Sequence, residues 1–271
     1  MKSTPSPTNN SQITLVTNCW EKDWKRMLCT DYLSANFQPL TKEGVSCRVL
    51  LINNVQNREK VERLARQKVE QGVLDAFYFS EDYADQALQA LQIERESLVR
   101  QGHDGFWYSI ACLVGIYLCR TPYLLYFMGD AGLPYGQDTS WVTASIQQME
   151  QDKRCIVANP VWNDCYKEAE QEADFQQGDF YYSKGFSDQC FLIPVEAYRQ
   201  NIYGYIHPVT EQRYPVYGGN CFERRVGAYL HSTDYWRLTY AKATYIHKDV
   251  TRFSYLKQKL EDIRHRFSSK G

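Results

Sequence analysis

Residues 106–128 constrain the fold more than any other part of the chain. This segment is apolar apart from a few small polar residues and a break at Arg120, Thr121 and Pro122. A membrane span needs about 20 uninterrupted apolar residues, whereas the break leaves a run of about 14 residues and then one of about six or seven. The segment therefore predicts a buried helix over residues 106–119 and a buried strand over residues 123–128.

Strand-like and helix-like segments alternate through the first half of the sequence. Apolar runs rich in β-branched and aromatic residues predict strands at residues 13–18, 47–54, 76–80, 123–128 and 155–159. Helical spacing of apolar residues predicts helices at residues 20–37, 58–71, 81–100, 106–119 and 138–151. Strands that are apolar on both faces are typical of a parallel sheet covered by helices. The predicted fold class is therefore α/β, with a mostly parallel sheet flanked by helices.

The pattern becomes irregular beyond the strand at residues 155–159. Residues 162–179 are polar, residues 180–194 are extended in character, and residues 201–219 combine Tyr, Pro and Gly without a period. A helix over residues 222–230 and a strand over residues 243–247 follow. Because no internal repeat or linker interrupts the chain, we expect one domain over residues 13–249, with halves at about 13–160 and 161–249. Long irregular connections of this kind usually carry function.

Both ends of the chain differ from this domain. Residues 1–12 are rich in Ser, Thr, Pro and Asn without an apolar core, which predicts a disordered leader and not a signal peptide. Residues 250–271 predict a basic amphipathic helix. This helix either packs its apolar stripe on the domain or makes a peripheral contact with an anionic membrane surface.

Charge and cysteine content limit the partners and the compartment. Lys and Arg number 31 against 32 Asp and Glu, so no overall positive field attracts nucleic acid, and we expect none as a partner. The nine cysteines are scattered without the spacing of a zinc site, mostly in apolar runs. We therefore expect free, packed thiols in a reducing compartment and a cytoplasmic protein.

Polar residues follow several predicted strands, where parallel sheets bind their ligands. Thr17 and Asn18 end the first strand, and Asn53 and Asn54 end the second. No glycine-rich dinucleotide motif or P-loop is present in the sequence. Asparagine side chains at these positions can bind a base or ribose, and they can equally cap turns.

Asp130 is the sharpest candidate among these residues. It follows the most apolar strand of the chain and lies between Gly129 and Gly132, which allow a tight turn and the close approach of a ligand. A single carboxylate here can hold a divalent cation together with substrate phosphates, or it can simply begin a turn.

The order of these motifs resembles the GT-A glycosyltransferases. In that superfamily a central strand ends in an acidic, metal-binding D-x-D, and here residues 123–128 are followed by Gly129 and Asp130. Two later segments, residues 187–191 (Ser-Asp-Gln-Cys-Phe) and residues 220–230 around Glu223, are similar to bacterial WavE-like lipopolysaccharide and capsule glycosyltransferases. The resemblance covers residues 13–249 and implies a GT-A-like, Rossmann-like fold whose irregular C-terminal region binds the acceptor.

The resemblance also implies roles for individual residues. The donor would contact Thr17, Asn18, Asn53, Asn54, Asp130 and Lys248. A Mn²⁺ or Mg²⁺ cofactor would be held by Asp130 and His247, although Met128 and Gly132 occupy the places where a second carboxylate of the D-x-D is expected. His247 can instead be an ordinary hydrogen-bonding residue.

Two carboxylates are candidates for the catalytic base that deprotonates the acceptor. They are Asp188 and Glu223, with turn formation as the alternative for Asp188 and an ion pair with Arg224 or Arg225 as the alternative for Glu223. The chain also contains 21 Tyr, many of them in the irregular half. Aromatic faces stack on sugar rings, so we expect Trp162, Tyr182 and Tyr217 to bind the acceptor unless they belong to the core.

These residues together predict a glycosyltransferase of cell-surface polysaccharide biosynthesis. It would move a sugar from a nucleotide-sugar donor to a glycan or lipid-linked acceptor, in the cytoplasm or at the inner face of the membrane. Two alternatives remain from the sequence: a non-catalytic nucleotide-sugar or glycan-binding protein on the same fold, and an unrelated α/β scaffold.

Overall fold

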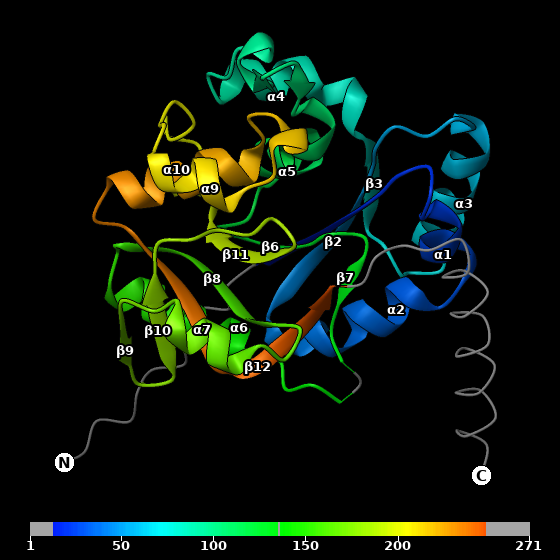
Figure 1. The fold of residues 1–271 in the computed structure, drawn as a ribbon. Coiled ribbons are helices and arrows are strands. Elements are labelled where there is room, and N and C mark those ends of the chain that lie inside the picture. The colour runs from blue at the N-terminus through cyan, green and yellow to red at the C-terminus, as the bar shows by residue number, and fades with distance from the viewer. Residues whose placement is uncertain (1–12, 135, 248–271) are drawn as a thin grey trace.

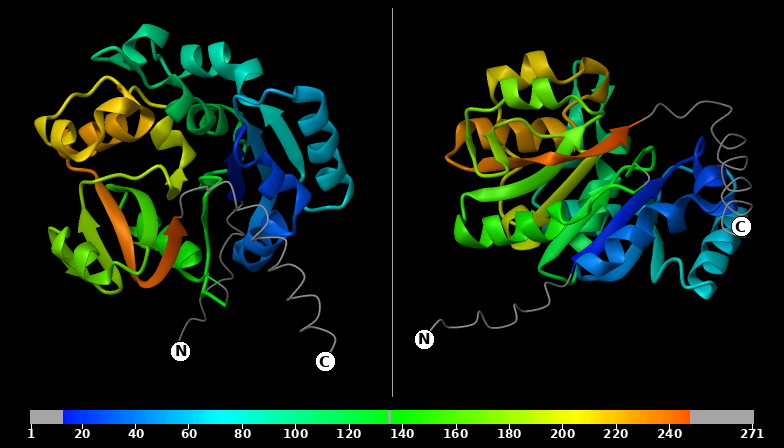
Figure 2. Two further views of the ribbon diagram at one scale, coloured as in Figure 1. Left: turned by 45° about the vertical axis from the view of Figure 1, so that its right-hand side comes forward. Right: turned by 90° about the horizontal axis from the view of Figure 1, so that it is seen from below.

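The computed structural model describes residues 13–134 and 136–247. The predicted leader, the predicted C-terminal helix and Lys248 lie outside the described residues. The described part is built on one large sheet with helices on both faces (Figures 1 and 2).

The sheet is parallel in its first half and mixed in its second (Figure 1). The strands run in the spatial order β3, β2, β1, β6, β11, β8, β12, β10, β9. The parallel part comprises β1 (Ile13–Cys19), β2 (Val45–Ile52), β3 (Ala76–Phe79) and β6 (Tyr123–Phe127). The mixed part comprises β8 (Cys155–Trp162), β9 (Phe175–Gln177), β10 (Phe180–Ser183), β11 (Cys190–Pro194) and β12 (Trp236–His247).

One antiparallel strand joins the two parts of this sheet. β11 lies between β6 and β8 and runs antiparallel to both, whereas β12 runs parallel to β8. The short strand β7 (Ala131–Gly132) pairs with the end of β12, and a separate small sheet pairs β4 (Val99–Arg100) with β5 (His103–Asp104). As a result, β6, β8 and β12 all point their carboxyl ends at one edge of the sheet.

Helices bury both faces of the sheet. One face packs on α1 (Trp24–Cys29), α2 (Tyr32–Phe37), α3 (Arg58–Glu70) and α6 (Trp141–Gln151). The other packs on α4 (Ala84–Ala90), α5 (Phe106–Leu118), α8 (Val195–Tyr198) and α10 (Phe222–Ser232). Alternate residues of β6 enter the two cores: Leu125 faces one and Leu124 the other. The remaining helices are α7 (Tyr166–Gln171) and α9 (Pro208–Arg213).

The α/β fold class predicted from the sequence is confirmed, and so are the buried helix and strand of residues 106–128. Three predicted elements differ most from their predicted bounds. The helix predicted at residues 20–37 is two helices, because the Thr30 hydroxyl donates to the carbonyl of Arg26 and accepts from the amide of Tyr32 at the break. The helix predicted at residues 81–100 ends near Gln92, whose φ is +56°. The last strand begins at Trp236, earlier than predicted.

Two further expectations concern cysteines and membranes. All nine cysteines are free thiols, as predicted. Among the described residues, no helix is both long enough and apolar enough to cross a bilayer.

Candidate active site

Three residues predicted separately come together at the carboxyl edge of the sheet. Asp130 follows β6, and Asp188 precedes β11, whose first residue Cys190 pairs with Phe127 at the end of β6. His247 ends β12 and pairs with Ala131, the neighbour of Asp130. The antiparallel insertion of β11 and the β7–β12 pairing therefore gather residues from three distant parts of the chain.

The turn that carries Asp130 is held from several sides. The Gly129 amide donates to Asn18 Oδ1 at 3.0 Å, and the Gly129 carbonyl accepts from Arg26 Nη2 at 2.5 Å. The Met128 amide donates to the carbonyl of Gln189 at 2.8 Å. A Cβ atom on Gly129 would lie 2.4 Å from the carbonyl oxygen of Asn18, which requires glycine at this position. Asn18 thus positions the turn.

Asp130 and His247 face each other across this turn. Asp130 Oδ1 lies 3.3 Å from His247 Nε2, and both side chains are mostly buried. Within the described residues, Asp130 Oδ1 accepts no hydrogen bond, so it is a buried acceptor without a donor. A cation would satisfy this oxygen, and carboxylate with imidazole is a donor set that Mn²⁺ accepts. No group of three or more His, Cys, Asp or Glu side chains suited to a metal occurs in the described part of the chain.

Asp188 and Glu223 form an electrostatically linked pair next to Asp130. Burial raises the pKa of Asp188 to about 7; Asp130 adds to this rise and His247 opposes it. Burial and then Asp188 raise the pKa of Glu223 well above its ordinary value, against the opposing effects of Arg213 and of hydrogen bonds from Ser187 and the Asp188 amide. Burial thus favours the protonated form of Glu223, and a pKa of about 7 lets Asp188 populate both of its forms near neutral pH.

The arginines that follow Glu223 have another role. Arg224 donates to the carbonyls of Thr210 and Tyr214 at 2.8 and 2.9 Å. Arg225 donates to the carbonyls of Tyr203 and Ser97 at 2.7 and 2.6 Å. Neither forms an ion pair with Glu223 among the described residues, and both hold the irregular segment of residues 201–219 against α10.

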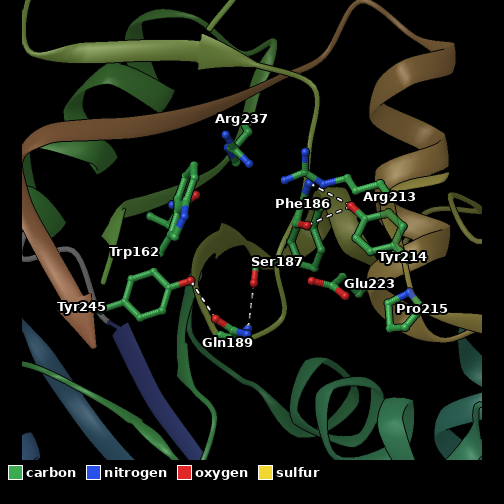
Figure 3. Close-up of a pocket in the computed structure, with 11 residues that line it drawn as sticks. Trp162, Phe186, Ser187, Gln189, Arg213, Tyr214, Pro215, Glu223, Arg237 and Tyr245 are labelled. Carbon is green, nitrogen blue, oxygen red and sulfur yellow. Dashed lines mark hydrogen bonds between the residues drawn. The ribbon is translucent and has the colours of Figure 1, made fainter. Parts of the chain in front are cut away.

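A cavity of about 270 Å³ lies beside this pair (Figure 3). It is bounded by residues of β8, β12, the segment before β11, the end of α9 and the start of α10. The lining residues are Asn159, Trp162, Phe186, Ser187, Gln189, Arg213, Tyr214, Pro215, Glu223, Arg237 and Tyr245. Glu223 lines the cavity and interacts electrostatically with the carboxyl group of Asp188, which does not line it. A molecule bound in the cavity would therefore lie next to Glu223, with Asp188 behind it.

Several functional candidates were missed by sequence reasoning. Arg213 and Arg237 line the cavity, and Glu172 lies 2.5 Å and 3.2 Å from their guanidinium nitrogens, respectively. Asp23 is buried beside the Gly129 turn, where burial raises its pKa to about 7. No local motif marks these residues, because the contacts that define them cross between separate elements.

The residues predicted to bind the donor at the ends of β1 and β2 are packed in a strand, hydrogen-bonded to the backbone or part of a turn. Thr17 is buried within β1 between Leu50 and Phe127. Asn53 is buried and donates to the carbonyl of Trp107 at 3.1 Å, while its Oδ1 has no hydrogen-bond partner among the described residues. Asn54 is exposed with a φ of +49°, the conformation of a turn residue.

The three predicted acceptor residues lie in different places. Trp162 lines the cavity. Tyr217 is 62% exposed on the 3₁₀ turn Val216–Gly218 and does not line it. Tyr182 is buried in the core, stacked on Phe175, and its hydroxyl accepts from Gln148. The ring of Tyr182 therefore points into the core, which is the alternative that the sequence left open for it.

Comparison with known proteins adds one structural likeness. No protein-family model matches the sequence, and no curated protein matches it either. The structure is similar to that of GalNAc-T7 with UDP, GalNAc and Mn²⁺, with a TM-score of 0.52 and 12% identity over 91% of this chain and 47% of that one. The chain shares the fold of that glycosyltransferase. It spans about half the length of GalNAc-T7.

Two other solved structures are similar at lower scores. One is glucosyl-3-phosphoglycerate synthase from Mycobacterium tuberculosis with Mn²⁺, UDP and glucosyl-3-phosphoglycerate, at a TM-score of 0.46 and 10% identity, covering 98% of this chain and 86% of that one. The other is mouse xyloside xylosyltransferase 1, at a TM-score of 0.39 and 10% identity, covering 82% of each chain.

Proposed function

We propose that this protein is a glycosyltransferase that uses a nucleotide-sugar donor. The observation that carries the proposal is the meeting of Asp130, Asp188 and His247 at the carboxyl edge of the sheet. In a doubly covered parallel sheet this edge is where ligands bind. The fold shared with GalNAc-T7, whose structure contains UDP and Mn²⁺, supports the same assignment.

The donor side of the site would use Asp130 and His247 to hold Mn²⁺ or Mg²⁺. A bound divalent cation supplies positive charge to the diphosphate that leaves. Asp130 has the buried oxygen without a hydrogen-bond donor that such a cation would satisfy. Thr17, Asn18, Asn53, Asn54 and Lys248 remain predicted donor contacts.

The acceptor side would use the cavity and the two carboxyl groups next to it. The acceptor hydroxyl oxygen forms a bond to the anomeric carbon of the donor, the bond from that carbon to the nucleoside diphosphate breaks, and the hydroxyl proton passes to Asp188. A pKa of about 7 suits Asp188 to take up that proton near neutral pH. Glu223, whose pKa is raised by burial and by Asp188, would act as a hydrogen-bonding neighbour, with a direct role as base as the alternative.

The pathway assignment rests on the resemblance to WavE-like enzymes. We propose surface polysaccharide assembly, with a glycan or lipid-linked acceptor, in the cytoplasm or at the inner face of the membrane. The predicted basic helix over residues 250–271 would supply a peripheral membrane contact.

One observation favours a second candidate, a non-catalytic nucleotide-sugar or glycan-binding protein. The D-x-D is reduced to one carboxylate, and no group of three metal-ligating side chains occurs within residues 13–134 and 136–247. Such a protein would bind the donor without cleaving it.

Donor hydrolysis and nucleotide binding together test the two candidates. Nucleoside diphosphates and their sugars are first screened by thermal shift with and without Mn²⁺, because a ligand of the native state raises the melting temperature. Release of the nucleoside diphosphate is then measured for wild type, Asp130→Asn and the control Asp179→Asn, an exposed carboxylate that pairs with Lys242. The transferase predicts turnover that Asp130→Asn removes and Asp179→Asn keeps. Binding without turnover in wild type supports the second candidate, and the absence of both rejects the two.

A further inference from the structure

The cavity next to Glu223 has an uneven distribution of charge. The guanidinium groups of Arg213 and Arg237 lie together on one side, and Ser187, Gln189 and Glu223 lie across from them (Figure 3). Arg213 Nη1 is 2.5 Å from Glu172 Oε1, and Arg237 Nη2 is 3.2 Å from Glu172 Oε2. One carboxylate is thus shared by two guanidinium groups.

The shared carboxylate leaves the arginines incompletely paired. Arg237 is 2% exposed, and its Nε donates no hydrogen bond to any described residue. A buried N–H without an acceptor is costly, and buried arginine charge is normally paired in full. Glu223 forms no ion pair with either arginine among the described residues, and burial and Asp188 raise the pKa of its carboxyl group, which disfavours a negative charge there.

The remaining walls fit a flat, hydroxylated molecule. Trp162 lies with its ring 5.8 Å from the Arg237 guanidinium carbon, and Gln189 accepts a hydrogen bond from the Tyr245 hydroxyl at 3.2 Å. Aromatic faces stack on sugar rings, and polar side chains of this kind bind hydroxyl groups. A volume of about 270 Å³ is near the lower end of small-molecule sites, which run from about 300 Å³ upward.

We propose that the cavity binds an acceptor sugar that carries an anionic group, a carboxylate or a phosphate, and that Arg213 and Arg237 bind this group. The proposal rests on the proposed transferase function, because it treats the cavity as the acceptor site. A purely structural Arg–Glu–Arg cluster is the competing explanation. It accounts for the ion pairs but not for their position on a cavity wall.

Matched sugars test the proposal directly. Methyl glucuronide and methyl glucoside differ only in having a carboxylate or a hydroxymethyl group, and methyl glucoside 6-phosphate carries the phosphate. Binding of each to the full chain is followed by saturation-transfer NMR, with inorganic phosphate as a competitor. We expect at least one anionic sugar to bind tenfold or more tightly than methyl glucoside, and the stronger of the two identifies the group. Equal affinities, or no binding of any of the three, overturn the proposal.

Variants locate the site. Arg213→Met should weaken binding of the anionic sugar by tenfold or more, Arg213→Lys should weaken it less, and Arg154→Gln should leave it unchanged because Arg154 is exposed and pairs with Asp152 elsewhere. Arg213 is chosen over Arg237 because Arg237 is fully buried and its replacement endangers folding. Unchanged binding in folded Arg213→Met overturns the assignment.

Nucleoside diphosphate binding, measured by thermal shift on the same samples, separates this proposal from the proposed function. Loss of sugar discrimination with nucleotide binding intact rejects the anionic acceptor alone. Arginine-dependent sugar binding without nucleotide binding or turnover supports the anion site and rejects the transferase.

Discussion

The buried carboxyl group of Asp23, next to the Asp130 turn, should make the stability of the protein depend on pH. This carboxyl is 2% exposed, and its Oδ1 accepts from the Trp20 amide at 2.7 Å. Burial raises the pKa of Asp23 from 3.8 to about 7, and the negative charge of Asp130 adds to the rise, whereas the Trp20 hydrogen bond and Arg26 oppose it. The substitution Asp23→Asn keeps an acceptor for the Trp20 amide but cannot ionise.

The sign of the effect follows from proton binding in the two states. Between pH 3.8 and about 7 the folded protein keeps the Asp23 proton and the unfolded chain has lost it, so stability falls as pH rises through this window. Above about 7 both states are ionised and the slope disappears. When the pH is raised from about 5.5 to about 8.5, Asp23 therefore lowers the free energy of unfolding of the wild type by about 2 kcal/mol. The decrease is about 1.4 kcal/mol per pH unit and stops at the pKa of Asp23 in the folded protein.

Urea unfolding at the two pH values measures this cost. Over this pH interval, the free energy of unfolding should decrease by about 2 kcal/mol less for Asp23→Asn than for wild type. Asp82→Asn is the matched control: Asp82 is exposed and paired with Arg58, which lowers its pKa, so it is ionised in both states throughout the interval. Other titrating groups cancel in the comparison. Equal pH dependence in Asp23→Asn and wild type would refute the buried, protonated carboxyl.

Three further predictions concern the turn, the irregular segment and the chemistry. Gly129→Ala should destabilise the protein by about 1–3 kcal/mol in urea unfolding and weaken nucleotide binding, because its Cβ would lie 2.4 Å from the Asn18 carbonyl oxygen. Arg225→Met should cost about 1–3 kcal/mol, since it removes the donor to the buried carbonyl of Tyr203, and Arg225→Lys should cost less; a melting temperature equal to wild type for Arg225→Met would contradict this. If Asp188 accepts the proton, the transfer rate should rise with pH and level off above about pH 7, and a flat profile from pH 5 to 8 would exclude it.

The sequence predicts the parallel half of the fold well because each of its elements is encoded locally. The apolar residues 106–128, interrupted at Arg120, predict α5 and β6 without any knowledge of their partners. Strand pairing is different, because periodicity identifies a strand but not its neighbours. The insertion of β11 between β6 and β8 is decided by long-range packing, and it is this insertion that carries Asp188 to Asp130.

Some residues of the candidate site could likewise be proposed from the sequence and others could not. Asp130 could be proposed from its position after a strand, and His247 and Asp188 from the resemblance. Arg213 and Arg237 could not be predicted, because one ends α9, the other lies in β12, and only Glu172 brings them together. The burial of Tyr182 could not be predicted either, since a tyrosine-rich segment does not say which ring faces the core.

The two sides of the site are stabilised by different physical means, which bears on how they would evolve. The Asp130 turn is fixed by backbone hydrogen bonds between strands and by a glycine that no other residue can replace without displacing the Asn18 carbonyl. The segment that carries Arg213 is held by Arg224, which donates to the carbonyls of Thr210 and Tyr214 on either side of it. Substitutions at Arg213 therefore need not disturb the sheet edge. If the cavity binds the acceptor as proposed, acceptor specificity can change through Arg213 while the sheet edge and the fold remain intact.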